Sequence, residues 1–225
     1  MIFSSREAIY SHACAYLSQH PIWASLITEI GPCKHEAKPE REPYEALIRA
    51  IAYQQISAKA GDAILRRLRS AFHTDAISFP LPQQLIDVDL DILRQCGFSA
   101  RKAETLKAIA QGAMSGQVPS RVAATGYSDE ELIAKLTALK GIGRWTVEML
   151  LIYTLERIDI MPLDDFGIQQ GLHYLHAPSS KLSKGQLKAF SEICAPYRTI
   201  AAWYLWRIPQ LPDYLAFKAN RAVVT

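Results

Sequence analysis

Apolar side chains recur every three or four residues along most of this chain, which is the spacing of one face of an α-helix. Six such positions in residues 45–72 predict a long helix or two abutting helices: Leu47, Ile48, Ile51, Ile64, Leu65 and Leu68. The same spacing recurs at roughly 5–30, 83–95, 99–115, 128–138, 144–157, 165–176, 183–194 and 196–207. Alternating strand-like segments are missing. The sequence therefore predicts an all-α fold.

Prolines separate these helical segments. Pro32, Pro39 and Pro43 interrupt a polar stretch after the first segment, and FPLPQQ (79–84) supplies a second break. With 225 residues, of which 49% are hydrophobic, the chain can form one large domain or two small domains that share a cleft.

Composition excludes several classes of protein without selecting one. Polar or charged residues recur through the first twenty positions, and no run of about 18 apolar residues exists, so we expect neither a signal peptide nor a membrane span. The net charge of +3 and the pI near 8.6 permit a polyanionic partner without requiring one. The cysteines form no CxxC pair, so we expect reduced thiols and no zinc or iron–sulfur site: Cys14, Cys33, Cys96 and Cys194.

A glycine-rich connection in LKGIGRWT (139–146) joins two of the predicted helices. One helix ends near Leu139 and the next begins near Arg144, and Gly141 and Gly143 allow a tight turn between them. Amide groups at the N-terminus of the second helix, flanked by Lys140 and Arg144, would bind an anion such as a phosphodiester. The alternative is a plain helical hairpin with a glycine C-cap.

Two further patterns bear on this hairpin. Residues 96–110 have the same outline as 140–154, with a glycine turn, a basic residue that opens a helix and a glutamate at the corresponding place. This weak repeat would mean that two hairpins contact the same backbone. Asp164 and Asp165 follow Pro162 and open another helix, where one of them can serve as the N-cap.

The string from Leu139 to Thr146, together with the aspartates that follow it, closely resembles the helix-hairpin-helix DNA glycosylase superfamily. The resemblance covers approximately residues 40–210 and is to the compact form of the DNA-3-methyladenine glycosylase II family, which lacks an N-terminal β domain. The family usually has proline where Lys140 stands. The resemblance implies a two-lobed fold with the active-site cleft between the lobes: a hairpin lobe of 43–164 and a second helical lobe of 1–42 and 165–225.

The resemblance also implies an activity, namely hydrolysis of the N-glycosidic bond of alkylated purines, of the 3-methyladenine or 7-methylguanine type, in duplex DNA. Asp165 matches the catalytic carboxylate, which would stabilise an oxocarbenium-like sugar and orient water, and Asp164 would be a capping or supporting group. Lyase-competent relatives have a lysine where Trp145 stands. The resemblance therefore implies a monofunctional enzyme that flips the damaged base and leaves an intact abasic site.

Further site residues follow from the same resemblance. Trp145, Met149 and Tyr197 would line the base pocket, where stacking would favour a cationic base by about 0.5–2 kcal/mol. Gln55 and Ile56, in AYQQISAKA (52–60), would form a wedge that fills the vacated stack, although Ile56 could equally be core. The residues expected to bind the DNA backbone are Lys140, Gly141, Gly143, Arg144, Thr146, Ser99, Lys102 and Arg198, of which Arg198 could instead brace Asp164.

The remaining expectations concern cofactors, partners and packing. Carbonyls of Thr137, Leu139 and Ile142 could hold a Na⁺ or K⁺ ion, and no catalytic metal or organic cofactor is expected. Trp203 and Trp206 recur at helical spacing and are interpreted as core. We expect an intracellular monomer, cytoplasmic or nucleoid-associated in a bacterium and nuclear in a eukaryote, that binds damaged double-stranded DNA and no membrane.

Two alternatives remain open at this stage. The first is a glycosylase for a different lesion, such as a deaminated base or ethenoadenine, because Met149 and Tyr197 depart from the commonest pocket residues. The second is a noncatalytic relative that binds DNA structure through the hairpin, against which the retained Asp165 argues.

Overall fold

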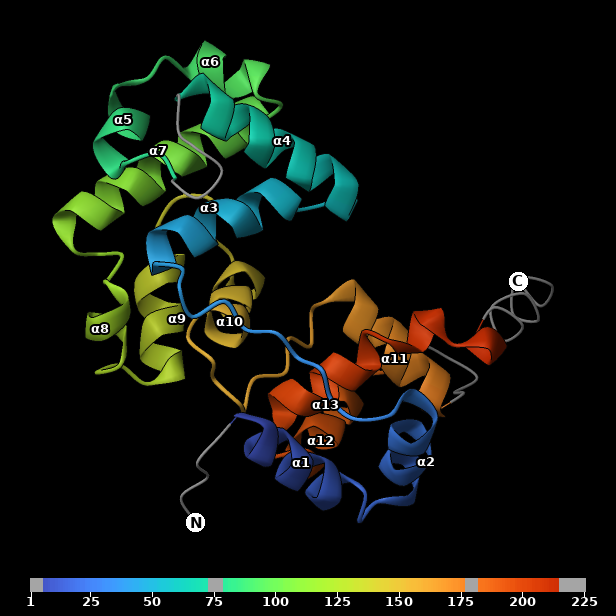
Figure 1. The fold of residues 1–225 in the computed structure, drawn as a ribbon. Coiled ribbons are helices and arrows are strands. Elements are labelled where there is room, and N and C mark those ends of the chain that lie inside the picture. The colour runs from blue at the N-terminus through green and yellow to red at the C-terminus, as the bar shows by residue number, and fades with distance from the viewer. Residues whose placement is uncertain (1–5, 73–78, 177–181, 215–225) are drawn as a thin grey trace. The chain divides into compact units, whose positions relative to one another are not determined.

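The computed structural model describes residues 6–72, 79–176 and 182–214, and within these ranges every regular element is a helix. The all-α prediction is confirmed. The helices, shown in Figure 1, are α1 (Arg6–Leu17), α2 (Pro21–Ile30), α3 (Pro43–Tyr53), α4 (Ala58–Ala71), α5 (Pro82–Asp87), α6 (Leu90–Gln95), α7 (Ala100–Ser115), α8 (Arg121–Ala124), α9 (Asp129–Thr137), α10 (Arg144–Tyr153), α11 (Phe166–His176), α12 (Lys184–Ile193), α13 (Arg198–Leu205) and the 3₁₀ helix η1 (Ile208–Gln210).

The chain divides into two compact units. We call Ala37–Glu156 the hairpin unit and Met1–Glu36 with Arg157–Thr225 the terminal unit. The boundaries lie six and eight residues before those expected from the sequence, at 42/43 and 164/165.

Hydrogen bonds explain where the boundaries fall. The amide of Lys38 donates to the carbonyl of Tyr153, 2.6 Å away, which ties the proline-rich stretch to the hairpin unit. The amide of Thr199 donates to the carbonyl of Ile158 at 3.0 Å, and its hydroxyl accepts from the amide of Ile160 at 3.1 Å. The segment before α11 therefore belongs with α13 in the terminal unit.

Helix α3 is the centre of the hairpin unit. Seven of its eleven residues are buried, which is the consequence of its broad apolar stripe, and it packs against α4, α7 and α10. The 45–72 segment resolves into two helices, because the chain leaves helical geometry after Tyr53 and Ser57 caps α4 by accepting from the amide of Ala60. Gln55, between them, has a left-handed φ of +58°.

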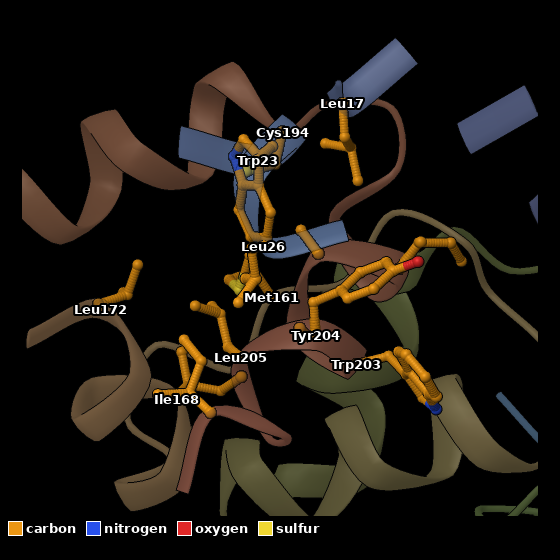
Figure 2. Packing of buried hydrophobic residues seen from close by; sticks show 14 of the residues in the cluster. Leu17, Trp23, Leu26, Met161, Ile168, Leu172, Cys194, Trp203, Tyr204 and Leu205 are labelled. Atoms are coloured by element: carbon orange, nitrogen blue, oxygen red, sulfur yellow. The ribbon is translucent and has the colours of Figure 1, made fainter. Parts of the chain in front are cut away.

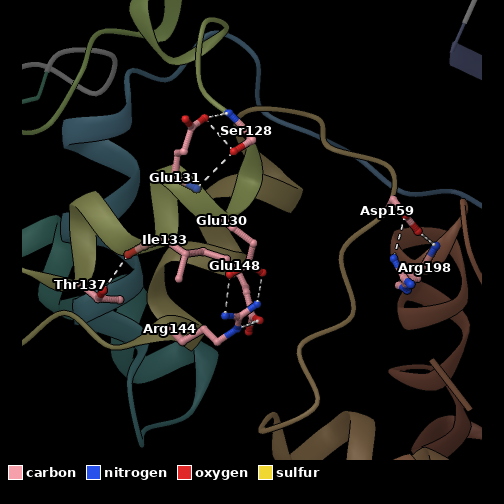
Figure 3. A network of polar contacts seen from close by, with 9 residues as sticks. All are labelled: Ser128, Glu130, Glu131, Ile133, Thr137, Arg144, Glu148, Asp159 and Arg198. Carbon is pink, nitrogen blue, oxygen red and sulfur yellow. Dashed lines mark hydrogen bonds and ion pairs between the residues drawn. The ribbon is translucent and has the colours of Figure 1, made fainter. Parts of the chain in front are cut away.

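Several helices begin after a serine whose side chain accepts a hydrogen bond from a backbone amide of the first turn. At α9 the Ser128 hydroxyl accepts from the amide of Glu131, whose carboxylate accepts in turn from the amide and hydroxyl of Ser128 (Figure 3). This capping box fixes the first turn of α9. The C-terminus of the same helix is followed by the glycine-rich turn.

Helix α13 is the centre of the terminal unit. Seven of its eight residues are buried, and it packs against α1, α2 and α11. Figure 2 shows Trp203, Tyr204 and Leu205 of this helix within a cluster that also contains Trp23 and Met161. The core role predicted for Trp203 is therefore confirmed.

The segment predicted as helical at 5–30 breaks into α1 and α2 at Pro21, where proline occupies the first position of the second helix. Likewise the 83–95 segment breaks into α5 and α6 at Asp89, which caps α6.

Among the described residues, no helix is both long and apolar enough to cross a membrane.

Contact between α11 and α13 depends on the absence of a side chain at Gly171. A methyl group added at this position is therefore expected to destabilise the protein. A Cβ atom on Gly171 would lie 2.8 Å from the carbonyl oxygen of Leu205. We expect Gly171→Ala to lower the free energy of unfolding by about 1–3 kcal/mol, because backbone cannot yield as a flexible side chain can. Chemical denaturation followed by circular dichroism measures this change.

The matched control is Gly185→Ala on the exposed first turn of α12, where the nearest side-chain atom to a Cβ is 4.0 Å away. That substitution is expected to stabilise the protein by about 0.5–1 kcal/mol, because alanine loses less conformational entropy in a helix. Equal changes in the free energy of unfolding for Gly171→Ala and Gly185→Ala would contradict the close packing described at Gly171.

Candidate nucleic-acid and catalytic site

The hairpin predicted from the glycine-rich string is formed by α9 and α10 in the hairpin unit. Helix α10 begins at Arg144, as predicted, and α9 ends at Thr137, two residues before the expected end. Gly141 in the turn has a left-handed φ of +86°, whereas Gly143 immediately before α10 has an ordinary φ of −97°. The two glycines therefore serve different purposes.

Gly141 allows the turn to approach α7 closely. A Cβ atom on Gly141 would lie 2.0 Å from Thr105 Oγ1. Thr105 is buried, and its hydroxyl donates to the carbonyl of Arg101 at 2.9 Å, so its position is fixed. Leu139 and Ile142 are buried on either side of Gly141. The turn is thus packed against α7 on one side.

Gly143 leaves the first turn of α10 without a side-chain cap. A Cβ atom at Gly143 would meet no atom of the described residues within 4 Å. The N-terminus of α10 therefore combines backbone amides, the positive end of the helix dipole and room for a ligand to approach. These are the requirements of an oxyanion site such as one for phosphate.

Lys140 and Arg144, which were expected to bind phosphate, contact carboxylates in the structure. Lys140 Nζ lies 2.8 Å from a carboxylate oxygen of Glu104 on α7. Arg144 donates to both oxygens of Glu130, at 2.6 and 3.1 Å, and through Nε to Glu148, at 2.9 Å (Figure 3). The hydrogen bond from Arg144 lowers the pKa of Glu130, and this bond and the one to Glu148 raise the pKa of Arg144.

The pairs that involve Glu104 and Glu130 lie on the surface. Lys140 and Glu130 are about three-quarters exposed, at 75% and 73% of their side chains. Exposed ion pairs contribute only about 0–1 kcal/mol, so a phosphate group can compete for either cation. Phosphate contacts by Lys140 and Arg144 stay a prediction.

The weak sequence repeat corresponds to a second hairpin of similar geometry, formed by α6 and α7. Gly97 has a left-handed φ of +107°, like Gly141, and Phe98 is buried as Ile142 is. The difference lies at the next position, where Ser99 replaces glycine and its hydroxyl accepts from the amide of Lys102 at 3.3 Å. The N-terminus of α7 is therefore capped by its own serine, which weakens the case for phosphate binding by Ser99.

Two residues expected to contact the DNA backbone, the buried Thr146 and the half-buried Lys102, bind the turn after α3 through their side chains. Thr146 is 1% exposed, its amide donates to the carbonyl of Gly143, and its hydroxyl accepts from Gln54 Nε2 at 2.9 Å. Lys102 Nζ donates to the carbonyl of Gln54 at 2.8 Å. Both side chains bind Gln54, so neither bond supports the predicted contacts of Thr146 and Lys102 with the DNA backbone, and these contacts stay a prediction.

Arg198 also has an intramolecular role. Its guanidinium donates to Asp159 Oδ2 at 2.8 Å (Figure 3). It also donates to the carbonyl of Ser191 at 3.1 Å. The bracing partner is therefore Asp159 and not Asp164, and the ion pair holds the segment that leads towards α11. Neither bond supports the predicted contact of Arg198 with DNA phosphate.

Asp165 is the N-cap of α11. Its Oδ1 accepts from the amide of Ile168 at 3.0 Å and from the indole Nε1 of Trp206 at 2.8 Å. A Cβ atom on Gly167 would lie 2.8 Å from Trp206 Cδ1 and 3.1 Å from Asp165 Oδ1, so glycine is needed for the indole to reach the carboxylate. The carboxylate is thus held by two donors from different elements.

The contact between Trp206 and Asp165 differs from the core role expected for this tryptophan. Trp206 is half-buried, whereas Trp203 is 5% exposed. Both residues recur at helical spacing, so no signal in the sequence distinguished them. Asp164 is exposed, and the capping bond to the Ile168 amide comes from Asp165.

The expected pocket residues lie in different units. Trp145 and Met149 are half-buried, one turn apart on α10 of the hairpin unit. Tyr197, in the terminal unit, is 8% exposed, makes an edge contact with Tyr16 at a ring distance of 5.3 Å, and its hydroxyl lies 2.9 Å from His12 Nδ1. Its burial leaves little ring face for a base, and the pocket stays a prediction.

The expected wedge residues lie in the turn between α3 and α4. Gln55 is exposed in its left-handed conformation, and Ile56 is 39% exposed, so the reading of Ile56 as core is wrong. An exposed apolar side chain next to a left-handed residue other than glycine is consistent with a contact surface.

The expected cation site consists of backbone carbonyls at the end of α9 and in the turn that follows it. The carbonyl of Leu139, one of the three expected ligands, accepts from the amide of Ile142 at 3.2 Å and retains a second lone pair. In the part of the chain that the structure describes, no three His, Cys, Asp or Glu residues lie together as metal ligands would. A monovalent ion at Thr137, Leu139 and Ile142 stays a prediction.

Comparison with known proteins places this geometry in a family. Residues 48–196 match the family model described as the HhH-GPD superfamily of base excision DNA repair proteins, a range that contains the hairpin and Asp165. The chain belongs to this superfamily. Its helical fold is the fold of this superfamily.

Relatives within the HhH-GPD superfamily match most of the chain. DNA-3-methyladenine glycosylase 1 of Schizosaccharomyces pombe is 48% identical over 193 residues, which cover 85% of this chain and 84% of that protein. The alkylbase DNA glycosidase-like protein mag2 of the same organism is 39% identical over 208 residues, covering 92% and 97%.

Two solved structures of the superfamily are similar throughout. An S. pombe 3-methyladenine DNA glycosylase in complex with abasic DNA has a TM-score of 0.82 and 46% identity, covering 90% of this chain and 98% of its own. A DNA-3-methyladenine glycosidase from Bacillus halodurans has a TM-score of 0.75 and 30% identity, covering 96% and 92%.

The different roles of the hairpin glycines predict different effects of alanine. Gly141→Ala is expected to lower the free energy of unfolding by at least about 1–2 kcal/mol, the cost of a left-handed residue with a side chain, and the clash with Thr105 adds to it. Gly143→Ala is expected to cost less than about 1 kcal/mol, because its φ is ordinary and the space beyond it is open. Unfolding in urea measures the free energy of unfolding of both variants. Equal losses of stability would contradict the different roles assigned to Gly141 and Gly143.

Proposed function

We propose that this protein is a monofunctional DNA glycosylase that hydrolyses the N-glycosidic bond of alkylated purines, of the 3-methyladenine or 7-methylguanine type, in duplex DNA. The observation that carries the proposal is the Asp165 carboxylate, fixed at the start of α11 by two donors in a chain of the HhH-GPD superfamily. Its relatives named DNA-3-methyladenine glycosylase support the substrate class.

The carboxylate suits the charge that develops during the reaction. The bond between the sugar C1′ and the purine nitrogen breaks, and the electron pair leaves with the base. The sugar becomes cationic, so the fixed anion of Asp165 stabilises it, and a water oxygen then bonds to C1′ while its proton passes to the carboxylate or to solvent. An alkylated purine carries a positive charge and leaves as a neutral base, so no separate general acid is required.

The same residues favour hydrolysis over strand cleavage. A lyase step requires an amine nucleophile at the sugar. Trp145 occupies the place of the lysine that lyase-competent relatives have, and Lys140 lies before the turn, 2.8 Å from Glu104. The product is therefore an intact abasic site.

The hairpin supplies contacts to the DNA backbone that are independent of base sequence. Amides at the N-terminus of α10 bind a phosphate oxygen, and Lys140 and the outer nitrogens of Arg144 exchange Glu104 and Glu130 for phosphate. Gln55 and Ile56 fill the space that the flipped base vacates, and the half-buried Trp145 and Met149 on α10 contact the base, for which Tyr197 stays a further predicted contact. A Na⁺ or K⁺ ion at the hairpin carbonyls would add a bridge to phosphate.

The expected setting follows from this activity. The partner is double-stranded DNA that contains damaged bases, the enzyme acts as an intracellular monomer without an organic cofactor, and the abasic product enters base excision repair. The relative whose structure contains abasic DNA supports the choice of duplex DNA as partner.

Replacement of Asp165 by asparagine tests the proposal. We expect Asp165→Asn to release methylated purines from N-methylated duplex DNA about 10²–10³-fold more slowly than wild type, because the charge is lost. Asparagine also caps helices well, so the fold and the affinity for an abasic duplex should remain. Chromatography of the released bases measures the rate, and gel electrophoresis should show no strand nicks.

Three other outcomes would each contradict part of the proposal. Wild-type binding to DNA without base release would favour a noncatalytic DNA-structure binder. Release of deaminated bases or ethenoadenine without methylated purines would change the lesion class. Equal rates for wild type and Asp165→Asn would remove the catalytic role of this carboxylate.

Trp206 serves as a positioning residue in the same scheme. Trp206→Phe keeps an aromatic ring but removes the donor to Asp165 Oδ1, and we expect the single-turnover rate to fall about tenfold with unchanged affinity for an abasic duplex. The matched control is Trp203→Phe, since the Trp203 indole N–H is buried without a hydrogen-bond partner in the described part of the chain. This control should retain the wild-type rate, and equal losses for both variants would contradict positioning by the Trp206 donor.

A further inference from the structure

Gln54 is the point at which two hairpins of the hairpin unit meet the turn after α3. Its carbonyl accepts from Lys102 Nζ on α7 at 2.8 Å, and its side-chain Nε2 donates to Thr146 Oγ1 on α10 at 2.9 Å. Lys102 Nζ also lies 3.5 Å from the carbonyl of Ala52 in the last turn of α3. One residue is therefore held through its backbone by one helix and through its side chain by another.

The two residues that hold Gln54 occupy equivalent positions. Lys102 is the third residue of α7 and Thr146 the third residue of α10, and each follows a left-handed glycine, Gly97 or Gly141, by five positions. The weak repeat in the sequence thus has a structural consequence, because the second helices of two similar hairpins converge on Gln54.

Gln54 directly precedes the two wedge residues. Gln55 has a left-handed φ of +58°, and such a conformation in a residue other than glycine costs about 1–3 kcal/mol and persists only where its surroundings impose it. Ser57 fixes the other end of the turn by capping α4. Gln55 and the exposed Ile56 therefore lie between two fixed points, one of which is the Gln54 network.

The environment of Lys102 fits a structural use of its charge. Partial burial lowers the pKa of the Lys102 ammonium, and the carbonyls of Gln54 and Ala52 replace part of its lost hydration. Hydrogen bonds from a charged donor are stronger than neutral ones, so this lysine is a firm anchor for the turn.

We propose that Lys102 and Thr146 are positioning residues that hold Gln54 and thereby fix Gln55 and Ile56 in the conformation that enters the DNA stack. The inference rests on the proposed function, since it assigns these residues a role in base flipping. Neither residue contacts the DNA in this scheme. Their effect on the reaction passes through the wedge.

The test compares Lys102→Met with a matched control, Lys107→Met. Lys107 lies on the same helix and donates through Nζ to the carbonyl of Ile86 at 2.9 Å, so both variants remove a bond from lysine to a backbone carbonyl. At saturating enzyme on N-methylated duplex DNA, we expect Lys102→Met to reduce the single-turnover rate about tenfold and Lys107→Met to leave it within about twofold. Lys102→Arg, which keeps a charged donor, should recover most of the loss.

A second background separates positioning from general stability. In a variant that already carries Gln55→Ala and Ile56→Ala, the wedge is gone, so Lys102→Met should reduce the rate by less than about twofold further. A tenfold loss in both backgrounds, or equal losses for Lys102→Met and Lys107→Met, would overturn the inference. Thermal denaturation of both lysine variants shows whether their stabilities are matched.

A fluorescence change on DNA binding, which does not require base release, tests this inference separately from the proposed function. A duplex with 2-aminopurine opposite a tetrahydrofuran abasic site changes its fluorescence when a side chain enters the stack. We expect Lys102→Met and Thr146→Val to reduce the change seen with wild type, and Lys107→Met to retain it. No base release by wild type would refute the glycosylase proposal alone, whereas an unaltered fluorescence change in Lys102→Met and Thr146→Val would refute the positioning role.

Discussion

The close approach of Gly141 to Thr105 is the constraint on which the hairpin unit depends. A Cβ atom at this point would lie 2.0 Å from the threonine hydroxyl, so only glycine allows the α9–α10 turn to rest on α7. That contact fixes the start of α10 relative to the start of α7. With both starts fixed, Thr146 and Lys102 can reach the same residue, Gln54, from two sides. A single missing methyl group thus aligns the uncapped N-terminus of α10 with the turn after α3.

The terminal unit solves a comparable problem with a different contact. Gly167 leaves room for Trp206, and the indole N–H joins the amide of Ile168 on one oxygen of Asp165. A helix cap ordinarily serves stability alone, but the proposed function gives the capped carboxylate a second role. In that proposal capping and catalysis share a residue, and the second donor, from the tryptophan, fixes the orientation of the carboxylate.

Local signals in the sequence predicted the helical class and the start of α10, because both depend on residues close together in the chain. The sequence could not supply the partners of individual side chains. Lys102 and Thr146 have residue types common at phosphate sites, yet in the fold both side chains hydrogen-bond to Gln54. Trp206 looked like its core neighbour three residues earlier, because its bond to Asp165 is formed across elements distant in sequence. Residue type and spacing indicate which groups are available, and packing decides which of them face solvent.

Arg144 presents two separate edges of one guanidinium. Its Nε donates to Glu148, which is 5% exposed, while the other two nitrogens donate to the exposed Glu130. A buried carboxylate that lost its cation would be strongly destabilised, so the inner edge must stay in place in the proposed exchange of Glu130 for phosphate at the outer edge. Arginine can divide its donors in this way because the fork is planar and rigid, whereas a lysine ammonium has a single point of charge. Under the proposed function, the hairpin therefore exchanges a surface carboxylate for phosphate without disturbing the buried pair between Arg144 and Glu148.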